Sequence, residues 1–232
     1  MRLSFFSMFW WRRLGCLLLL AGGTSGLAAG QYLARPRLPA RALRCTLEAV
    51  APEYLAYEPI ILRVRILNRA DSALTLVSAL HGSESGKRSP RAAFYVSVVS
   101  LLGPRPEPPA YSGHLHGIGP DDFVTLAPGQ SFNPLERMTR FPFALPSVYP
   151  VLPPGTYDIT FRYSTLEQDA AEWGELYPPT KTPNSLAATG AAGAGLPEPL
   201  LPLLRRVPRV ALSSNTVRVV VRPQPNGNLA RP

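Results

Sequence analysis

The chain has 232 residues, 46% of them hydrophobic and 27 of them proline, and its formal net charge is +9 at pH 7. Proline removes a backbone donor and disrupts helix interiors, so this composition excludes a fold built from long helices. Basic charge attracts nucleic acid or anionic surfaces, but no cluster of aromatic and basic residues accompanies it, and we expect no nucleic-acid partner. Weak attraction to anionic envelope polymers stays open.

The N-terminal residues 1–30 have the pattern of a signal peptide. Three arginines and no acid make the start basic, residues 14–21 form a short apolar run, and small residues follow. This order predicts cleavage after residue 30 and export to the periplasm or the extracellular space. The alternative is an uncleaved anchor, although Arg12 and Arg13 divide the apolar residues into pieces shorter than the roughly 20 that span a bilayer.

Residues 31–42 contain prolines and arginines with little periodicity, which predicts an extended leader into the domain. After cleavage Cys45 is the one cysteine left, so no intramolecular disulfide stabilises the fold. Cys45 alternates with polar residues and shares a strand face with Leu43 and Leu47. We therefore expect a buried thiol that packs as a small hydrophobic side chain, rather than a reactive cysteine.

Alternation of apolar and polar residues, interrupted by turn signals, predicts a series of short strands after the leader. The predicted strands are 43–50, 60–66, 74–80, 92–102, 122–126, one within 131–143, 156–163 and 215–222. Seven or eight such strands with few helix signals favour an all-β fold, an immunoglobulin-like antiparallel β-sandwich with long loop insertions.

A tyrosine corner supports this fold class. Pro153, Pro154 and Gly155 break the chain, and Tyr157 then opens a strand with one apolar and one polar face. In immunoglobulin-like sandwiches a tyrosine at this position hydrogen-bonds to the backbone a few residues upstream. We assign Gly155 and Tyr157 structural roles.

The sandwich is expected to span residues 43–222, with a disordered tail at 223–232. Two insertions, 103–121 and 164–213, are longer than ordinary hairpin loops. Within the second, residues 166–176 are compatible with one short helix. The leucine-rich part, 196–210, is too apolar to be left in water, so we expect it to pack on the sandwich or on a partner.

Few residues are candidates for chemistry. His114 and His116 lie two apart on an extended segment, with Asp121 and Asp122 close behind, and together they would suffice as metal ligands. Such spacing is common in solvated loops, which is the interpretation we prefer. No catalytic motif occurs, and we expect no catalytic residue, no bound metal and no cofactor.

Aromatic residues in the insertions are the remaining candidates. Trp173 either packs the second insertion or forms an exposed anchor for a partner together with Tyr177. Tyr111 lies in the first insertion, just before the two histidines. We therefore list Tyr111, His114, His116, Trp173 and Tyr177 as candidate binding residues.

The order of several short motifs resembles a known class of domains. The motifs are Tyr111-Ser112-Gly113, residues 122–131, residues 154–159, and Ser214-Asn215. This succession is similar to bacterial secreted immunoglobulin-like domains, in particular the non-catalytic N-terminal β domain of deuterolysin-class metalloproteases. The chain has no HExxH motif, so the resemblance implies an accessory or prosegment-like module and not a peptidase.

These observations favour a non-enzymatic, exported module that binds a protein or cell-envelope partner through residues 111–119 and the 164–213 insertion. One alternative is a structural envelope protein held by an uncleaved N-terminal segment, which would be its only contact with a membrane. A less favoured alternative is a metal-dependent hydrolase that uses the two histidines and the aspartates behind them.

Overall fold

The computed structural model describes residues 33–56, 58–86, 88–102, 117–136, 148–149, 152–173 and 198–225. The strands are β1 (Leu43–Ala49), β2 (Glu53–Leu55), β3 (Ile60–Asn68), β4 (Leu74–Val77), β5 (Arg91–Leu101), β6 (Phe123–Leu126), β7 (Ser131–Phe132), β8 (Val148–Tyr149), β9 (Gly155–Ser164), β10 (Ala211–Ser213) and β11 (Val217–Arg222).

The helices in the described residues are all short, with three to six residues each. These are the α-helix α1 (Leu201–Arg206) and the 3-10 helices η1 (Ala40–Ala42), η2 (Pro120–Asp122), η4 (Ala170–Trp173) and η5 (Glu198–Leu200). Among the described parts of the chain, none of these helices has the length and hydropathy of a membrane span. The predicted all-β fold class is confirmed.

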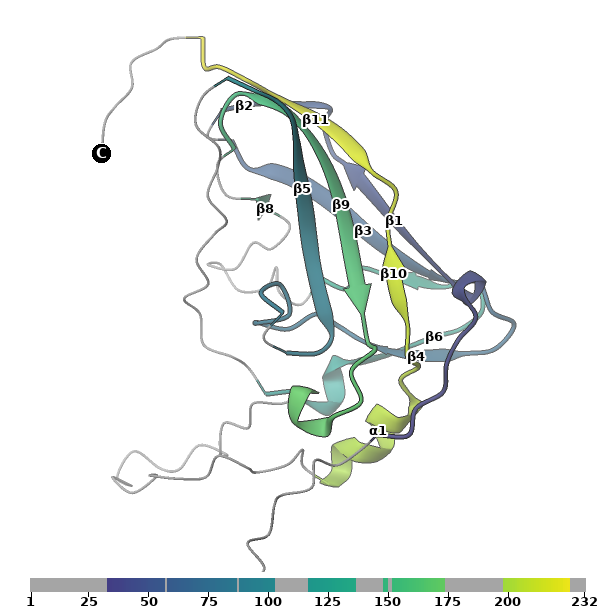
Figure 1. Cartoon of the computed structure of the whole chain (residues 1–232). Coiled ribbons are helices and arrows are strands. Elements are labelled where there is room, and N and C mark those ends of the chain that lie inside the picture. Colours follow the sequence, from purple (N-terminus) through teal and green to yellow (C-terminus); the bar gives the residue numbers. More distant parts are fainter. Residues whose placement is uncertain are drawn as a thin grey trace, which may run out of the picture.

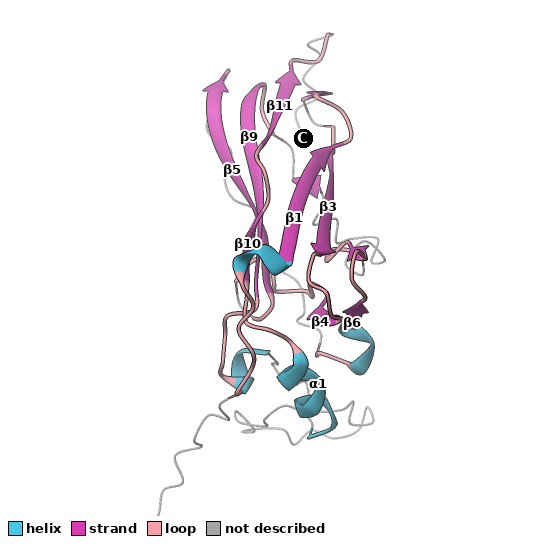
Figure 2. Ribbon diagram, turned by 90° about the vertical axis from the view of Figure 1, so that its right-hand side faces the viewer, coloured by secondary structure: helices cyan, strands magenta, loops and turns pink. Residues whose placement is uncertain are grey.

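Two main sheets face each other (Figures 1 and 2). One has the strand order β1-β3-β7, and β8 also pairs with β3. In the other, β9 pairs antiparallel with β5 along one edge and with β10 and β11 along the other. Taking β1, β3 and β7 as strands A, B and E, and β5, β9 and β11 as C, F and G, this is the immunoglobulin-like arrangement.

The strands form where the sequence alternates, because one face of each strand packs into the space between the sheets. The burial pattern of β1 alternates over most of its length, and that of β3 alternates over nearly all nine residues. Ile66, Tyr157, Ile159 and Phe161 are completely buried there. The thiol of Cys45 is also in this core, as predicted, and retains 7% of its exposure.

The tyrosine corner is present. The Tyr157 hydroxyl donates a hydrogen bond of 2.6 Å to the carbonyl oxygen of Pro153, four residues upstream. The bond fixes the chain as it enters β9, the strand that joins β5 to β10 and β11. Gly155 lies so close to β5 that an added Cβ would meet the Ser100 carbonyl oxygen at 2.5 Å. Both structural assignments are consistent with these contacts.

The last strand is divided into β10 and β11 at Ser214 and Asn215. Here the Asn215 side chain replaces backbone pairing: its Nδ2 donates to the Leu47 carbonyl oxygen and its Oδ1 accepts from the Leu47 amide, both at 2.9 Å. These two bonds connect β1 of one sheet to the last strand of the other. The sandwich is thereby closed along this side.

All eight predicted strands are found, with differences in length. The third ends at Val77 instead of residue 80, and the strand expected within 131–143 is the two-residue β7. The structure adds β2, β8 and β10, which were not predicted. β2 pairs parallel with β11, so the strand pairing is not entirely antiparallel.

Candidate binding surface at the insertion end

One end of the sandwich carries two long connections between its strands. The segment between β3 and β5 contains β4 and the turns at 78–90, and the segment between β9 and β10 contains η4, η5 and α1. Both lie at the lower end in Figures 1 and 2. We call this region the insertion end. It corresponds to the end of an immunoglobulin-like sandwich that carries the B–C and F–G loops.

A second hydrophobic cluster holds the insertion end together. Its largest side chain, Trp173, is completely buried. Its indole Nε1 donates to the Glu167 carbonyl oxygen at 3.2 Å, so the polar atom of the ring is satisfied. The other buried members of the cluster are Leu33, Val77, Leu80, Ile118, Ala170, Leu200, Leu204 and Val207.

This cluster resolves two alternatives from the sequence. Trp173 packs the second insertion and is not an exposed anchor, because its ring has no accessible surface. The leucine-rich part of the insertion packs on the sandwich itself, through Leu204 and Val207 of α1 and its C-cap. Residues 166–176, considered as one short helix, contain the four-residue helix η4.

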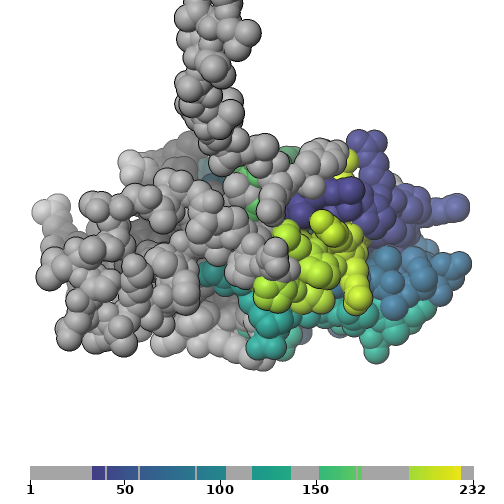
Figure 3. All heavy atoms as spheres, turned by 90° about the horizontal axis from the view of Figure 1, so that it is seen from below, coloured from purple at the N-terminus to yellow at the C-terminus, as the bar shows by residue number. Residues whose placement is uncertain are grey.

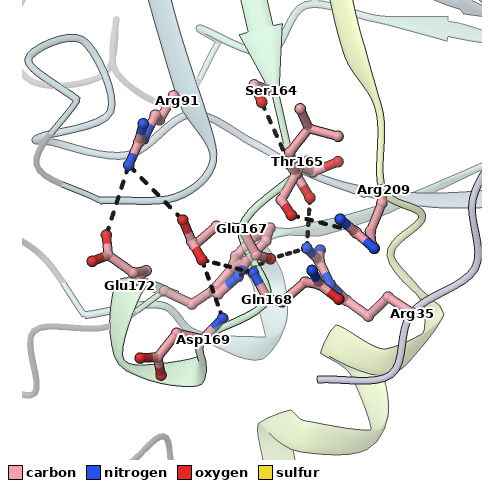
Figure 4. A network of polar contacts seen from close by, with 11 residues as sticks. Arg35, Arg91, Ser164, Thr165, Glu167, Gln168, Asp169, Glu172 and Arg209 are labelled. Carbon is pink, nitrogen blue, oxygen red and sulfur yellow. Dashed lines mark hydrogen bonds and ion pairs between the residues drawn. The ribbon is translucent and has the colours of Figure 1, made fainter. Parts of the chain in front are cut away.

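The leader belongs to the same cluster, which the sequence did not predict. The guanidinium of Arg35 lies over the Trp173 ring, 4.6 Å from its centroid, and the residue is 7% exposed. Arg35 Nη2 donates to the backbone oxygens of Thr165, at 2.5 Å, and of Glu167 (Figure 4). Burial, followed by the charge of Arg209, lowers the pKa of Arg35 to about 10.

Backbone bonds extend the leader's attachment on both sides of Arg35. The Leu33 amide donates to the Gln168 carbonyl oxygen at 2.9 Å, and the Arg209 amide donates to the Pro36 carbonyl oxygen at 2.7 Å. Arg37 also forms a parallel bridge with Arg209. Residues 33–39 of the leader are therefore extended, as predicted, and belong to the folded insertion end, whereas residues 40–42 form the 3-10 helix η1 and not an extended segment.

The turns before β5 are tied to the second insertion by hydrogen bonds. The Ser89 amide donates to the Glu172 carbonyl oxygen at 2.7 Å, and the buried Arg88 donates through Nη2 to the Trp173 carbonyl oxygen at 3.3 Å. Tyr163, at the end of β9, donates its hydroxyl to the Val77 carbonyl oxygen at 2.7 Å. Its burial raises the pKa of that phenol.

Charged side chains lie on the surface of this end. Arg91 contacts the carboxylates of Glu167 and Glu172 at 4.0 Å, with all three partly exposed, so these pairs add little stability. Arg205 and Arg206 end α1 and are exposed. Figure 3 views this end from below, where α1 (yellow) lies at the surface beside the leader (purple).

The structure places only part of the predicted site. Tyr111, His114, His116 and Tyr177 lie outside the described residues. Asp121 is exposed, but Asp122 is buried and is not a solvated charge: its Oδ2 accepts a 2.7 Å hydrogen bond from the Gly119 amide and caps η2. Within the described ranges, no group of three or more histidine, cysteine, aspartate or glutamate side chains is arranged to hold a metal.

Sequence reasoning missed Arg35, Arg88 and the buried Ser83. The partners of the two arginines are far away along the chain, as with Arg35 and Thr165, 130 positions apart. Ser83 bonds to nearby residues, such as Leu80. The one available signal in the sequence was that Leu33 and Arg35 lie on the same side of an extended segment. Two residues are too few to predict that this side is buried.

Comparison of the chain with known protein families, with curated proteins and with solved structures found no match.

Proposed function

We propose that this protein is an exported, non-enzymatic binding module, and that its insertion end contacts a protein or cell-envelope partner. The observation that carries the proposal is the cluster around Trp173, which holds the turns before β5, the described parts of the second insertion and the leader in one arrangement. Loops on a rigid sandwich commonly carry recognition. Loops that are already ordered lose less conformational entropy when a partner binds.

The exposed charges of α1 are the best-placed contact for such a partner. Arg205 and Arg206 project from an element whose other side, through Leu204 and Val207, is packed into the cluster. Arginine forms paired hydrogen bonds with carboxylates, so an acidic partner surface suits this position. A narrower form of the proposal, an accessory role for a secreted protease, rests on the resemblance noted in the sequence.

The proposal is tested by affinity capture from the exported fraction of the source cells, with residues 31–232 as bait. The test variant is Arg205→Glu with Arg206→Glu. The matched control is Arg218→Glu with Arg222→Glu, which makes the same charge change on the exposed face of β11, outside the insertion end. We expect a specific partner whose retention drops at least about tenfold in the first variant and much less in the second.

Equal loss in both variants would point to nonspecific charge attraction and contradict the proposal. Recovery of no specific partner would contradict it as well. An intact mass that includes residues 1–30 in the exported protein would favour the anchored envelope alternative.

A further inference from the structure

The outer face of the β1–β3 pair carries a concentration of arginine. Arg44 on β1 and Arg63 and Arg65 on β3 are exposed on this side, and Arg41 and Arg69 lie exposed beyond one end of the pair. In Figure 2, β1 and β3 form the layer away from β5 and β9. Glu48 is the one acidic side chain of the two strands.

The strand register places three of these arginines together. Thr46 pairs with Arg65, and its neighbours Arg44 and Glu48 pair with Leu67 and Arg63. Successive residues on one face of a strand are about 7 Å apart, and diagonal neighbours on paired strands are about 7–8 Å apart. Arg65 therefore lies within about one Debye length at physiological salt, roughly 8 Å, of both Arg44 and Arg63. Arg44 and Arg63 themselves are separated by four residues along the paired strands, or about 14 Å.

These arginines differ from those of the opposite sheet. There Arg218 forms a bidentate pair with Asp158 at 2.7 and 2.8 Å, and Arg222 forms one with Glu53 at 2.7 and 2.6 Å. Arg162 lies over the Tyr95 ring, 4.3 Å from its centroid. In the described part of the chain, by contrast, no ion pair involves the arginines of the β1–β3 face.

The same face ends in two exposed apolar residues. Val50 retains 46% of its exposure and Ile61 47%, and the Val50 amide donates to the Ile61 carbonyl oxygen at 3.0 Å, so the two side chains are cross-strand neighbours. Apolar side chains beside a basic surface are typical of proteins that lie at a membrane interface. The apolar groups enter the headgroup region, while arginines stay at the level of the phosphates.

We propose that the outer face of β1 and β3 binds the surface of a bilayer containing anionic phospholipid. Charge complementarity provides the attraction, and Val50 and Ile61 distinguish a bilayer from a soluble polyanion, which offers them no apolar layer. The proposal is independent of the insertion end and differs from the expectation that the N-terminal segment makes the only membrane contact.

The test is sedimentation with vesicles of phosphatidylcholine alone or of phosphatidylcholine with phosphatidylglycerol. Residues 31–232 contain every described element, and circular dichroism first verifies that this chain folds. The test variant is Arg44→Gln, Arg63→Gln and Arg65→Gln. The control is Arg162→Gln, Arg218→Gln and Arg222→Gln, which removes the same charge from the opposite sheet. A parallel comparison of the two variants in the full chain holds the N-terminal contribution constant.

We expect binding only to the anionic vesicles, weakened between about 0.1 and 0.5 M salt. One arginine near such a surface is worth about a fivefold change in partitioning, so the test variant should lose about a hundredfold, and the control less than about tenfold. Val50→Ser with Ile61→Ser should reduce binding several-fold without changing the charge.

Three results would overturn the proposal. Equal loss in the two triple variants would show that net charge, not this face, is responsible. Equal binding to neutral vesicles would remove the role of the arginines. Binding of the face to heparin or single-stranded DNA with no binding to vesicles would assign it to a soluble polyanion instead.

Discussion

At the scale of single residues, Cys45 links the core to a measurable pH dependence. Burial raises the pKa of its thiol from the ordinary value of 9.0 to about 12. Between these two pH values the thiol ionises in the unfolded chain but stays protonated in the folded one. Stability contributed by the buried neutral thiol is therefore complete below pH 9 and is lost as the pH rises towards 12, by at most about 1.4 kcal/mol per pH unit.

The measurement is urea unfolding of residues 31–232 and of Cys45→Ala at several pH values from 8 to about 11. The alanine variant is less stable at pH 8 because it leaves a small cavity, but its stability should decline less steeply with pH. Taking the difference between the two chains cancels the titration of the tyrosines, which are common to both. Parallel pH profiles would contradict the assignment of Cys45 to a sealed core.

At the scale of elements, the contact between β5 and β9 depends on Gly155. A Cβ at this position would meet the Ser100 carbonyl oxygen at 2.5 Å and the Tyr157 hydroxyl at 3.2 Å. The first of these is backbone, so Gly155→Ala must push the two strands apart and disturb the tyrosine corner. We expect a loss of about 1–3 kcal/mol in the free energy of unfolding.

Gly117→Ala is the control for this change, since a Cβ at Gly117 meets nothing within 4 Å. Thermal unfolding followed by circular dichroism compares the two variants. If Gly155→Ala unfolds at the same temperature as the control, β5 and β9 do not approach each other closely enough at Gly155 to exclude a Cβ atom.

The success of sequence reasoning also differs by element. Strands β1, β3, β9 and β11 were predictable because one half-buried face imposes a two-residue period over six or more residues. Strands β2, β8 and β10 have two or three residues each, too few to show a period. Their positions follow from partners elsewhere in the chain, as when Ser213 pairs with Arg162.

At the scale of the whole molecule, the candidate site was less predictable than the sandwich. The sequence indicated that the leucine-rich part of the second insertion, 196–210, was too apolar for water, and the structure buries Leu200, Leu204 and Val207 of this part in the second cluster. It did not indicate that the leader would cover Trp173, because the contact joins segments more than 130 residues apart. Four of the five candidate binding residues lie outside the described part of the chain, so their role stays a prediction.

The joining of leader and insertion can be tested with one pair of variants. Arg35 is buried against Trp173, whereas Arg37, two residues later on the same extended segment, is exposed. Arg35→Gln removes the stacking and shortens the donor that reaches the Thr165 and Glu167 oxygens, so it should cost about 1–3 kcal/mol. Arg37→Gln makes the same charge change and should cost less than about 0.5 kcal/mol.

The readout is fluorescence of residues 31–232, in which Trp173 is the one tryptophan. Arg35→Gln should shift the emission of Trp173 to longer wavelength and lower the temperature at which it becomes exposed. The sandwich, followed by far-ultraviolet circular dichroism, should unfold at nearly its original temperature, because Arg35 stacks on Trp173 and donates its hydrogen bonds to the backbone of the insertion. If both signals move together, the two clusters unfold as one cooperative unit, and the insertion end owes its order to the whole sandwich instead of to the leader.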